Sequence, residues 1–523
     1  MTLTAPHGAV GDILVGRERR LLERDILPSF LPLQRWFAGK GSRIKEVGIR
    51  YLGARAGTTQ GLTILDVETD GAGGRYFLPL QIRWGAENLQ PGNRLLSHTL
   101  ARARRGARLG AVVDAAFDDD FARDLMALIW SGEDREVIDG KLEIDATDRL
   151  RAMPRPAEVR RTLAEQSNVS AILDESIILK IYRALKTGPQ PDVEVGRFLT
   201  ETAGYPNTPA YLGAVTLRNG SGDCTTLASA FAFVPNQGDA WEVLLEALSR
   251  DLEAHCAITA DTGSEKNDFA FPLDIAPVLG RRTAELHAAF ATSTTDPGFR
   301  TRPVGRSDLD GWSETAAQEI RDGLSELRAA ARYAGDDLQA EIWAVLAAEP
   351  RLLKRIARVA RLDPVGDCTR IHGDLHLGQV LISKNDVFFV DFEGEPQREI
   401  EERRLKTSPL RDVAGIVRSF DYLAQAAMAR IRDVTGTLSE RQRERAIDWR
   451  SMASRAFLES YLDASRGAMA EPENRNYAIC LLDMFVLQKA VYELRYEASH
   501  RPAWLFIPIR GLLDIVNEEE SPI

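Results

Sequence analysis

The sequence has few cysteines, and their spacing argues against a metal site or a disulfide framework. Four occur among 523 residues, at Cys224, Cys256, Cys368 and Cys480. None belongs to a CxxC pair or lies in a histidine-rich stretch, which are the usual signs of zinc sites and redox motifs. We therefore expect all four to be reduced packing residues.

Long apolar runs are also missing. No uninterrupted stretch reaches the roughly 18 to 20 apolar residues that span a bilayer. The most apolar late segment, AICLLDMFVLQKAVYEL, is interrupted by Asp483 and Lys489. The start of the chain, MTLTAPHGAVGDILVGRERR, lacks the basic beginning and apolar run of an export signal. These absences predict a cytoplasmic protein that does not enter a membrane.

A long tract of lysine and arginine is absent too, and the net charge is −11. This charge repels phosphate backbones, so nucleic acids and anionic membranes are poor partners. The chain is 44% apolar and 27% charged, which is typical of folded proteins. At 523 residues it is too long for one compact core, and two or three domains are expected. Chemistry on small molecules becomes the leading class of function.

The pattern of apolar residues changes along the chain from β-rich to helical. Short alternating runs separated by glycine cover residues 46–84 and predict antiparallel strands. Residues 160–183 predict a three-stranded meander, and PDVEVGRFLTE, 191–201, predicts a helix after a proline. Two more strands are expected at 208–218 and 227–234, and helices dominate from there on.

One segment within the helical half carries an unusual density of ionisable residues: RIHGDLHLGQVLISKNDVFFVDFEGEP, 370–396. Gln379 follows Asp374 by five positions, and the apolar run VFFV ends at Asp391, seventeen positions after Asp374. Phosphoryl transfer from ATP needs a carboxylate to orient the attacking hydroxyl and another to hold Mg²⁺. Asp374 fits the first role and Asp391 the second, while Gln379 and Glu393 offer further oxygen ligands. Alternatively, the two aspartates cap turns at strand ends; their joint spacing favours the kinase interpretation.

A kinase also needs a cation on a strand of the N-terminal half to contact the phosphates. Lys180 lies in the apolar strand IILKIYR, where burial without a partner would be costly, and Glu194 is a candidate partner. A lysine that faces solvent at a strand edge is the alternative. No GxGxxG motif precedes it; the corresponding loop, EQSNVS, offers donors from Gln166, Ser167, Asn168 and Ser170. A plain hairpin turn explains this loop as well.

Together these segments resemble a known family. They are similar to segments of bacterial maltokinases, in the aminoglycoside-phosphotransferase-like branch of the protein-kinase fold. The segments that carry the resemblance are HGDLHLGQ with DFEGEP, EQSNVS, ILKIYR, FVPNQGDAW, SPLRDVAGIVRSFDY, KAVYELRYEASHRPAW and LPLQRWFAGKG. The resemblance runs from about Leu31 to Pro508.

The resemblance implies an α+β, bilobal protein-kinase-like fold with an extra N-terminal β-rich cap subdomain and a mostly helical C-terminal lobe. We place the cap at 1–92, the intermediate subdomain at 93–236 and the helical lobe at 237–523. It further implies transfer of phosphate from ATP, with Mg²⁺, to the anomeric hydroxyl of maltose, which yields maltose 1-phosphate for α-glucan (glycogen) synthesis. A trehalose synthase that forms maltose is the implied pathway partner.

The resemblance also assigns roles to residues. Asp374 is the catalytic base, Gln379 and Asp391 are metal ligands, and Lys180 is the phosphate lysine with Glu194 as its partner. The backbone of the hinge segment 233–241, which starts with Phe233 and Val234, would hold adenine.

The sugar acceptor is expected among acidic and aromatic residues of the helical lobe, because neutral sugars are held by carboxylates, amides and aromatic rings. Two segments supply such residues: Arg418, Asp421 and Tyr422 in the first, and Lys489, Tyr492, Glu493 and Tyr496 on one face of a helix in the second. The alternative is an ordinary i, i+4 ion pair with core tyrosines. His372 and Asp412 are expected to support the catalytic loop.

Two other functions stay open. A related kinase would use the same machinery on glucosamine, another sugar or an aminoglycoside. A non-catalytic kinase-like binding module is the alternative of a different class, although it has no need of Lys180, Asp374, Gln379 and Asp391 together.

Overall fold

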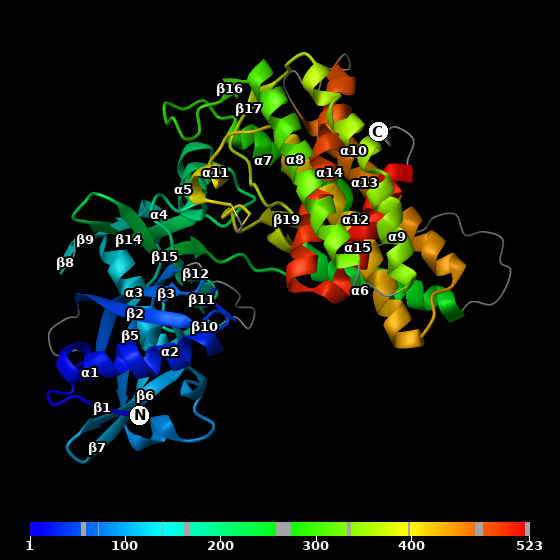
Figure 1. The fold of residues 1–523 in the computed structure, drawn as a ribbon. Coiled ribbons are helices and arrows are strands. Elements are labelled where there is room, and N and C mark those ends of the chain that lie inside the picture. The colour runs from blue at the N-terminus through cyan, green and yellow to red at the C-terminus, as the bar shows by residue number, and fades with distance from the viewer. Residues whose placement is uncertain are drawn as a thin grey trace. The chain divides into compact units, whose positions relative to one another are not determined.

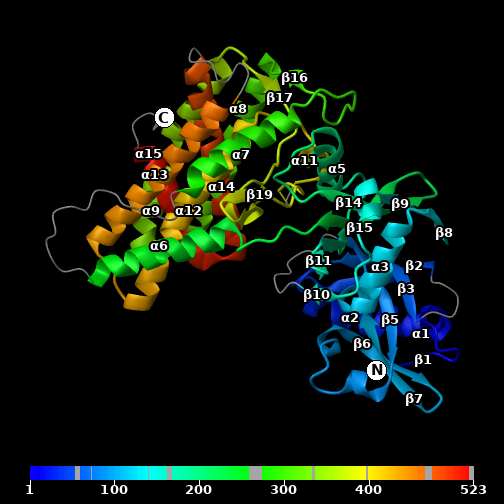
Figure 2. The same ribbon diagram turned by 180° about the vertical axis from the view of Figure 1, so that it is seen from behind.

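The structure, a computed structural model, describes residues 1–53, 59–71, 73–138, 140–161, 168–257, 274–331, 336–395, 398–465 and 474–517. It has two compact units. The first contains Met1–Arg197 and Pro209–Val234, and the second contains Phe198–Thr208 and Pro235–Ile523. Figures 1 and 2 show that strands dominate the first unit and helices the second.

The first unit begins with an eight-stranded sheet in the order β1-β6-β7-β5-β3-β4-β13, with β2 paired to β3. Its longest hairpin, β2–β3, alternates in burial, so that Val47 and Ile49 reach the core while their neighbours face outward. Helices α1 (Gly16–Leu21) and α2 (Leu27–Phe30) accompany this sheet, and Leu27 and Phe30 join its core. The strands are β1 (Thr2–Thr4), β2 (Ile44–Gly53), β3 (Gln60–Thr69), β4 (Gly74–Phe77), β5 (Leu80–Trp84), β6 (Thr99–Arg105), β7 (Arg108–Asp114) and β13 (Ala184–Leu185).

A second sheet in this unit has seven strands in the order β10-β11-β12-β15-β14-β9-β8. Its strands β10, β11 and β12 pair antiparallel in sequence, which confirms the meander predicted at 160–183. The strands predicted at 208–218 and 227–234 are β14 and β15. The strands are β8 (Arg135–Val137), β9 (Gly140–Ala146), β10 (Val159–Arg161), β11 (Asn168–Leu173), β12 (Ile177–Tyr182), β14 (Tyr211–Asn219) and β15 (Cys224–Ala232).

Helix α3 (Asp119–Ser131) covers part of the second sheet. It begins where the Asp118 side chain accepts from the Asp120 N–H and ends where Gly132 adopts a left-handed conformation, φ 60°. Leu125 and Ile129 are buried in the core that this helix shares with β9 and β14. Two shorter helices follow, α4 (Asp148–Ala152) and α5 (Pro191–Arg197). The helix predicted at 191–201 is α5, which continues as a wider turn, Phe198–Thr202.

The second unit is mostly helical. Its helices α12, α13 and α14 lie side by side (Figures 1 and 2). A hairpin, β18 (Val380–Ser383) with β19 (Asp386–Phe389), and the two-residue strands β16 (Arg302–Pro303) and β17 (Asp367–Cys368) interrupt the helices. The helices are α6 (Ala240–Ala257), α7 (Ile275–Phe290), α8 (Arg306–Ala330), α9 (Asp336–Ala347), α10 (Glu349–Ile356), α11 (Ile400–Arg403), α12 (Leu410–Thr435), α13 (Glu440–Ala464), α14 (Arg475–His500) and α15 (Phe506–Asn517).

The segment Phe198–Thr208 belongs to this unit because it is bonded to the β18–β19 hairpin. The Asn207 side-chain amide donates to the Val387 carbonyl at 2.9 Å, and the Thr208 hydroxyl donates to the Phe389 carbonyl at 3.0 Å. These bonds hold the strand that leads to Asp391.

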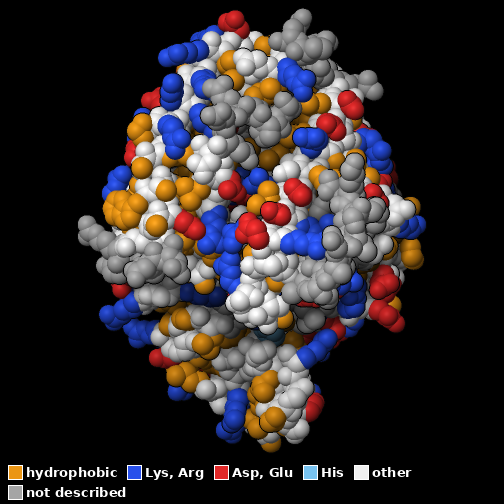
Figure 3. Space-filling model, turned by 90° about the vertical axis from the view of Figure 1, so that its right-hand side faces the viewer, with side chains coloured by type: hydrophobic (Ala, Val, Ile, Leu, Met, Phe, Trp, Pro, Cys, Tyr) orange, Lys and Arg blue, Asp and Glu red, His pale blue; other side chains and the backbone are white. Residues whose placement is uncertain are grey.

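The arrangement confirms the α+β class, with a β-rich N-terminal part and a mostly helical C-terminal part. The boundaries 1–92, 93–236 and 237–523 stay a prediction. Within the described part of the chain, no helix combines the length and apolarity needed to cross a bilayer. On the face drawn in Figure 3, acidic and basic side chains are interspersed.

Candidate active site

The segment that carries Asp374 is held by a carboxylate on helix α12. Asp412, which is 1% exposed, accepts from the backbone N–H groups of His372 at 2.8 Å and of Gly373 at 3.0 Å. His287 Nε2 contacts the same carboxylate at 3.3 Å. Burial opposes ionisation of Asp412, but the hydrogen bond and charge of His287, the charge of His372 and the Gly373 N–H outweigh it, so the pKa is lowered. Asp412 therefore fixes the backbone just before Asp374.

Helix α12 also approaches this loop closely enough to require a glycine. A Cβ placed on Gly415 would lie 2.1 Å from the backbone oxygen of Leu375, the residue after Asp374. Gly373 adopts φ 85°, a conformation that favours glycine, and its added Cβ would lie 3.6 Å from the Cα of Gly394. The loop with Asp374 and the loop after β19 are thus packed backbone against backbone.

Gln379 and Asp391 lie next to each other. The Gln379 side-chain amide donates to Asp391 Oδ2 at 3.3 Å, and the Val390 N–H donates to the Gln379 carbonyl at 3.0 Å. His372 adds a bond from Nε2 to the Val390 carbonyl at 2.9 Å. Asp391 has φ 65°, which is uncommon for a residue other than glycine and occurs often at functional sites. Glu393 follows two residues later, where its carbonyl accepts from Arg403 at 3.4 Å.

A second histidine shapes the turn between these residues. His376 Nδ1 accepts from the Gly378 N–H at 3.1 Å, at the start of the short 3₁₀ turn Leu377–Gln379. Nδ1 can accept only when the ring is neutral and its proton is on Nε2. Burial is the largest influence on His376 and lowers its pKa, which favours that neutral form.

Asp374 lines a pocket within the second unit, together with Lys489 and Tyr492 from helix α14. Lys489 Nζ donates to Asp374 Oδ1 at 2.9 Å and to Glu395 Oε1 at 3.4 Å, and it lies 4.5 Å from the centre of the Tyr492 ring. Burial disfavours the ammonium, but Asp374 and Glu395 outweigh this and raise the pKa of Lys489. The predicted acceptor residues Lys489 and Tyr492 are therefore brought to the predicted base.

Sequence reasoning missed the charged group around Glu395. This carboxylate is 4% exposed and is bonded by Arg398, Arg411 and Lys489. Burial alone would raise its pKa, but these three cations lower it to about 2. The sequence DFEGEPQRE contains Glu395 and Arg398, but the partners on α12 and α14 are distant in sequence and gave no signal.

Other predicted acceptor residues bind one another. Buried Arg418 donates to Glu493 and to Asp421, both at 2.7 Å. The Tyr422 hydroxyl donates to Glu497 at 2.6 Å, and Tyr496 stacks on His500 with ring centres 4.6 Å apart. Arg418 and Asp421 line a different pocket, whose other lining residues come mainly from helices α13, α14 and α15. The roles predicted for Arg418, Asp421, Tyr422, Glu493 and Tyr496 in binding the acceptor stay predictions.

The predicted nucleotide residues belong to the first unit. Lys180 on β12 donates to Asp192 Oδ2 at 2.9 Å; Asp192, two residues before Glu194, was not selected from the sequence. Asn168 and Ser170 lie on the neighbouring strand β11, where Ser170 is opposite Lys180. Phe233 donates its N–H to the Ser176 carbonyl at 2.9 Å, and Val234 is the last residue of the unit. Gln166 and Ser167 lie outside the described residues.

Comparison with known proteins identifies relatives of two kinds. Residues 30–118 match the family of the maltokinase N-terminal cap domain. A glucosamine kinase from Streptacidiphilus jiangxiensis is 27% identical over 364 residues, which cover 69% of this chain and 74% of that protein. A glucosamine kinase from Mycolicibacterium smegmatis is 24% identical over 368 residues, covering 69% and 80%.

Solved structures extend the likeness over nearly the whole chain. A glucosamine kinase, crystal form B, has a TM-score of 0.62 and 21% identity, and the match covers 93% of this chain and 97% of that one. A glucosamine kinase in complex with glucosamine, ADP and inorganic phosphate has a TM-score of 0.59 and 22% identity, covering 91% and 93%. The chain therefore carries a maltokinase N-terminal cap domain, is homologous to glucosamine kinases and has their bilobal kinase-like fold.

Proposed function

We propose that this protein is a sugar kinase that transfers phosphate from ATP to a hydroxyl of a neutral sugar, and that maltose, phosphorylated at its anomeric hydroxyl, is the acceptor. The observation that carries the proposal is the pocket around Asp374, in which Lys489 bridges Asp374 and Glu395. The kinase-like fold and the maltokinase cap domain support it.

Asp374 is the proposed base. A carboxylate in this role accepts the proton of the attacking hydroxyl and aims its oxygen at phosphorus. Such catalysis depends on how precisely the carboxylate is positioned. Asp412 holds the backbone before Asp374 in place by accepting from the N–H groups of His372 and Gly373. Lys180, held by Asp192 in the first unit, is the proposed cation for the phosphates of ATP.

The residues present fit a divalent metal ion. The amide oxygen of Gln379 and the carboxylate of Asp391 are hard oxygen ligands, and the contact at 3.3 Å between their side chains places them together. We propose Mg²⁺, held by Gln379 and Asp391 with Glu393 nearby in sequence. The ion would neutralise charge on the transferred phosphate.

The charges of the pocket favour an uncharged acceptor. Glu395 is satisfied by Arg398, Arg411 and Lys489, and Glu319 accepts from Arg398 at 3.2 Å and from Gln488 at 2.6 Å. An ammonium group brought to Asp374 would meet the ammonium of Lys489, which lies 2.9 Å from that carboxylate. Like charges at such a distance repel strongly in a partly buried site. A neutral hydroxylated ring avoids this repulsion.

Glucosamine is the second candidate, because the curated relatives are glucosamine kinases. An amino sugar whose amino group approaches Asp374 would need to bind as the free amine or displace Lys489 from that carboxylate. A trehalose synthase that supplies maltose, and a role in α-glucan synthesis, follow only if maltose is the acceptor.

The test is a steady-state comparison of maltose and glucosamine with ATP and Mg²⁺, with products identified by phosphorus NMR. We expect a sugar 1-phosphate from maltose and a higher kcat/KM than for glucosamine. Asp374→Asn should keep the fold and ATP binding while kcat falls by orders of magnitude. Efficient turnover of glucosamine with none of maltose would refute maltose as the acceptor. Full activity of Asp374→Asn would refute Asp374 as the base.

A further inference from the structure

The second unit contains a pocket that lies apart from the proposed site of phosphate transfer. It is formed by helices α12, α13 and α15, with Glu341 from α9, and its volume is about 310 Å³. This volume lies at the lower end of the range for small-molecule sites. None of the described residues lines both this pocket and the pocket of Asp374. We name it the α12 pocket, after the helix that supplies its polar groups.

Helix α12 presents an unpaired amide to this pocket. Gln425 is 9% exposed, and neither its Oε1 nor its Nε2 has a hydrogen-bond partner among the described residues. Both atoms nevertheless keep accessible surface. Two other buried glutamines of this unit are satisfied: Gln442 donates to the Leu252 carbonyl at 2.9 Å, and Gln488 donates to Glu319 at 2.6 Å. An amide that is nine-tenths buried and lacks a protein partner calls for one from outside the protein.

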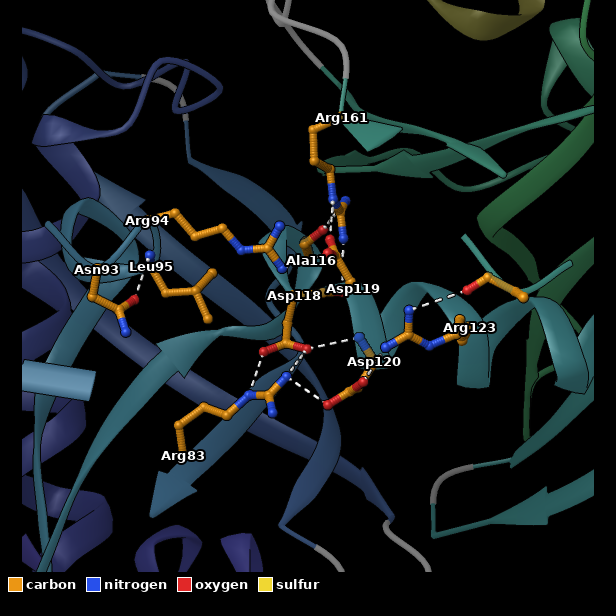
Figure 4. Close-up of polar contacts among 11 residues, drawn as sticks. Arg83, Asn93, Arg94, Leu95, Ala116, Asp118, Asp119, Asp120, Arg123 and Arg161 are labelled. Carbon is orange, nitrogen blue, oxygen red and sulfur yellow. Dashed lines mark hydrogen bonds and ion pairs between the residues drawn. The ribbon is translucent and has the colours of Figure 1, made fainter. Parts of the chain in front are cut away.

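Arg432 supplies an unpaired positive charge to the same pocket. It is partly buried, and its guanidinium makes no hydrogen bond or ion pair within the described part of the chain. Arginines elsewhere in this protein are commonly paired. Around the start of helix α3, for example, Arg83, Arg94 and Arg123 each bind an aspartate (Figure 4). Arg432 therefore has the capacity to bind an anion from solution.

The acidic side chains of the α12 pocket do not neutralise Arg432. Its two lining acids are already paired, Glu341 with Arg510 at 3.1 Å and Asp514 with Arg450 at 3.1 Å. One guanidinium matches the two oxygens of one carboxylate in a bidentate pair. A phosphate dianion calls for more unpaired positive charge than this. The charge of the pocket therefore favours a ligand with a single carboxylate.

The rest of the pocket wall is apolar and is supplied by Met428, Leu438, Ile447, Phe506 and Leu513. Gln425 and Arg432 are seven residues apart on one helix, so they lie on the same face, about 10 Å apart along its axis. The long Arg432 side chain can shorten this gap. A single ring that packs on Phe506 would then reach both polar groups.

We propose that the α12 pocket binds a small monocarboxylate with one apolar ring. The carboxylate pairs with Arg432, the ring packs against Met428 and Phe506, and a hydroxyl or amide group of the ligand bonds to Gln425. Asp374 does not line this pocket, so the bound acid is not a substrate of the transfer reaction. The inference therefore stands whichever sugar is phosphorylated.

The test is a ligand-observed NMR titration of the full-length protein without ATP. The probes are 4-hydroxyphenylacetate, its neutral amide, phenylacetate and phenyl phosphate. We expect 4-hydroxyphenylacetate to bind most tightly of the four. Loss of the charge in the amide should weaken binding by about tenfold or more, and loss of the hydroxyl in phenylacetate should weaken it by about two- to tenfold.

Variants assign the binding to the α12 pocket. Arg432→Gln should weaken 4-hydroxyphenylacetate by about tenfold or more. Arg430→Gln removes an equal charge from an exposed position on the same helix, outside the pocket, and should keep the binding. Gln425→Met should abolish the difference between 4-hydroxyphenylacetate and phenylacetate. Gln442→Met, at a satisfied glutamine, and Lys489→Met, in the pocket of Asp374, should bind as the wild type does.

Thermal unfolding separates lost binding from misfolding. Gln425→Met and Arg432→Gln remove no hydrogen bond between described side chains, so their melting temperatures should lie close to that of the wild type. Gln442→Met loses its bond to the Leu252 carbonyl and should melt lower. No binding of either carboxylate at millimolar concentration, equal binding of the acid and its amide, tighter binding of phenyl phosphate, or loss of binding in Arg430→Gln or Lys489→Met would each overturn the proposal.

Discussion

Replacing Gly415 by alanine tests how strictly helix α12 positions the proposed base. The added Cβ would lie 2.1 Å from the Leu375 carbonyl oxygen, a distance that real Cβ contacts essentially never show. A normal contact needs more than 3 Å, so the loop or the helix must move by about 1 Å. Leu375 directly follows Asp374, and a shift of that size in a catalytic group costs about 100-fold in rate.

The stability effect has two opposing parts. Overpacking of a close contact costs about 1 to 3 kcal/mol. Alanine is favoured over glycine within a helix by roughly 0.5 to 1 kcal/mol, which offsets part of this cost. We therefore expect Gly415→Ala to lose between about 0 and 2.5 kcal/mol of unfolding free energy and to remain folded at room temperature.

Gly311→Ala is the matched control. Gly311 is exposed on helix α8, and its added Cβ meets no described atom within 4 Å. This variant should gain up to about 1 kcal/mol and keep its activity. Urea denaturation gives the free energies, and kcat with ATP, Mg²⁺ and maltose gives the rate effect. A kcat for Gly415→Ala near that of the wild type would refute the view that this contact sets the position of Asp374.

Three further predictions concern the charged groups of the second unit. Asp412→Ala should lose about 3 kcal/mol or more of unfolding free energy, because the N–H groups of His372 and Gly373 lose their buried acceptor. Asp412→Asn keeps one acceptor oxygen and should lose less. Equal losses of the two variants in urea titrations would contradict this prediction. The pKa of Glu395 is lowered from 4.5 to about 2, so its ionisation adds about 3 kcal/mol to the free energy of unfolding. This contribution is fully present above about pH 4.5 and is lost as the pH falls through about 2. Glu395→Gln should lack this part of the pH dependence in acid unfolding curves. Lys489→Met removes the cation that lowers the pKa of Glu395 most, so the acid unfolding of this variant should begin at a higher pH than that of the wild type. An unchanged kcat/KM for maltose in the same variant would argue against contact between Lys489 and the acceptor.

The sequence indicated those parts of the site that depend on short-range spacing. Gln379 and Asp391 flank a tight hairpin, and a hairpin brings the residues before its first strand close to those after its second strand. The contact between Gln379 and Asp391 was therefore predictable from the local sequence. The meander around Lys180 was predicted for the same reason, because apolar alternation and turn residues are local signals.

Partners that come from distant helices were not predictable in this way. Glu395 pairs with Arg411 on α12 and with Lys489 on α14. A single sequence does not indicate which faces of distant helices pack against each other. The helical spacing of Lys489 and Glu493 placed both on one face, yet Lys489 binds Asp374 whereas Glu493 binds Arg418. Asp192 was missed because Glu194 fits the start of the same helix equally well by pattern.

The path of the chain between the units has a practical consequence for dissecting the protein. The backbone leaves the first unit after Arg197, returns at Pro209 and leaves again after Val234. A fragment that stops at residue 197 would lack β14 and β15, and β15 is the strand that joins β12 to the rest of its sheet. Such a fragment would expose the edge of β12 and invite aggregation. Expression of the first unit alone therefore requires a cut beyond Val234 and a short artificial connection in place of 198–208.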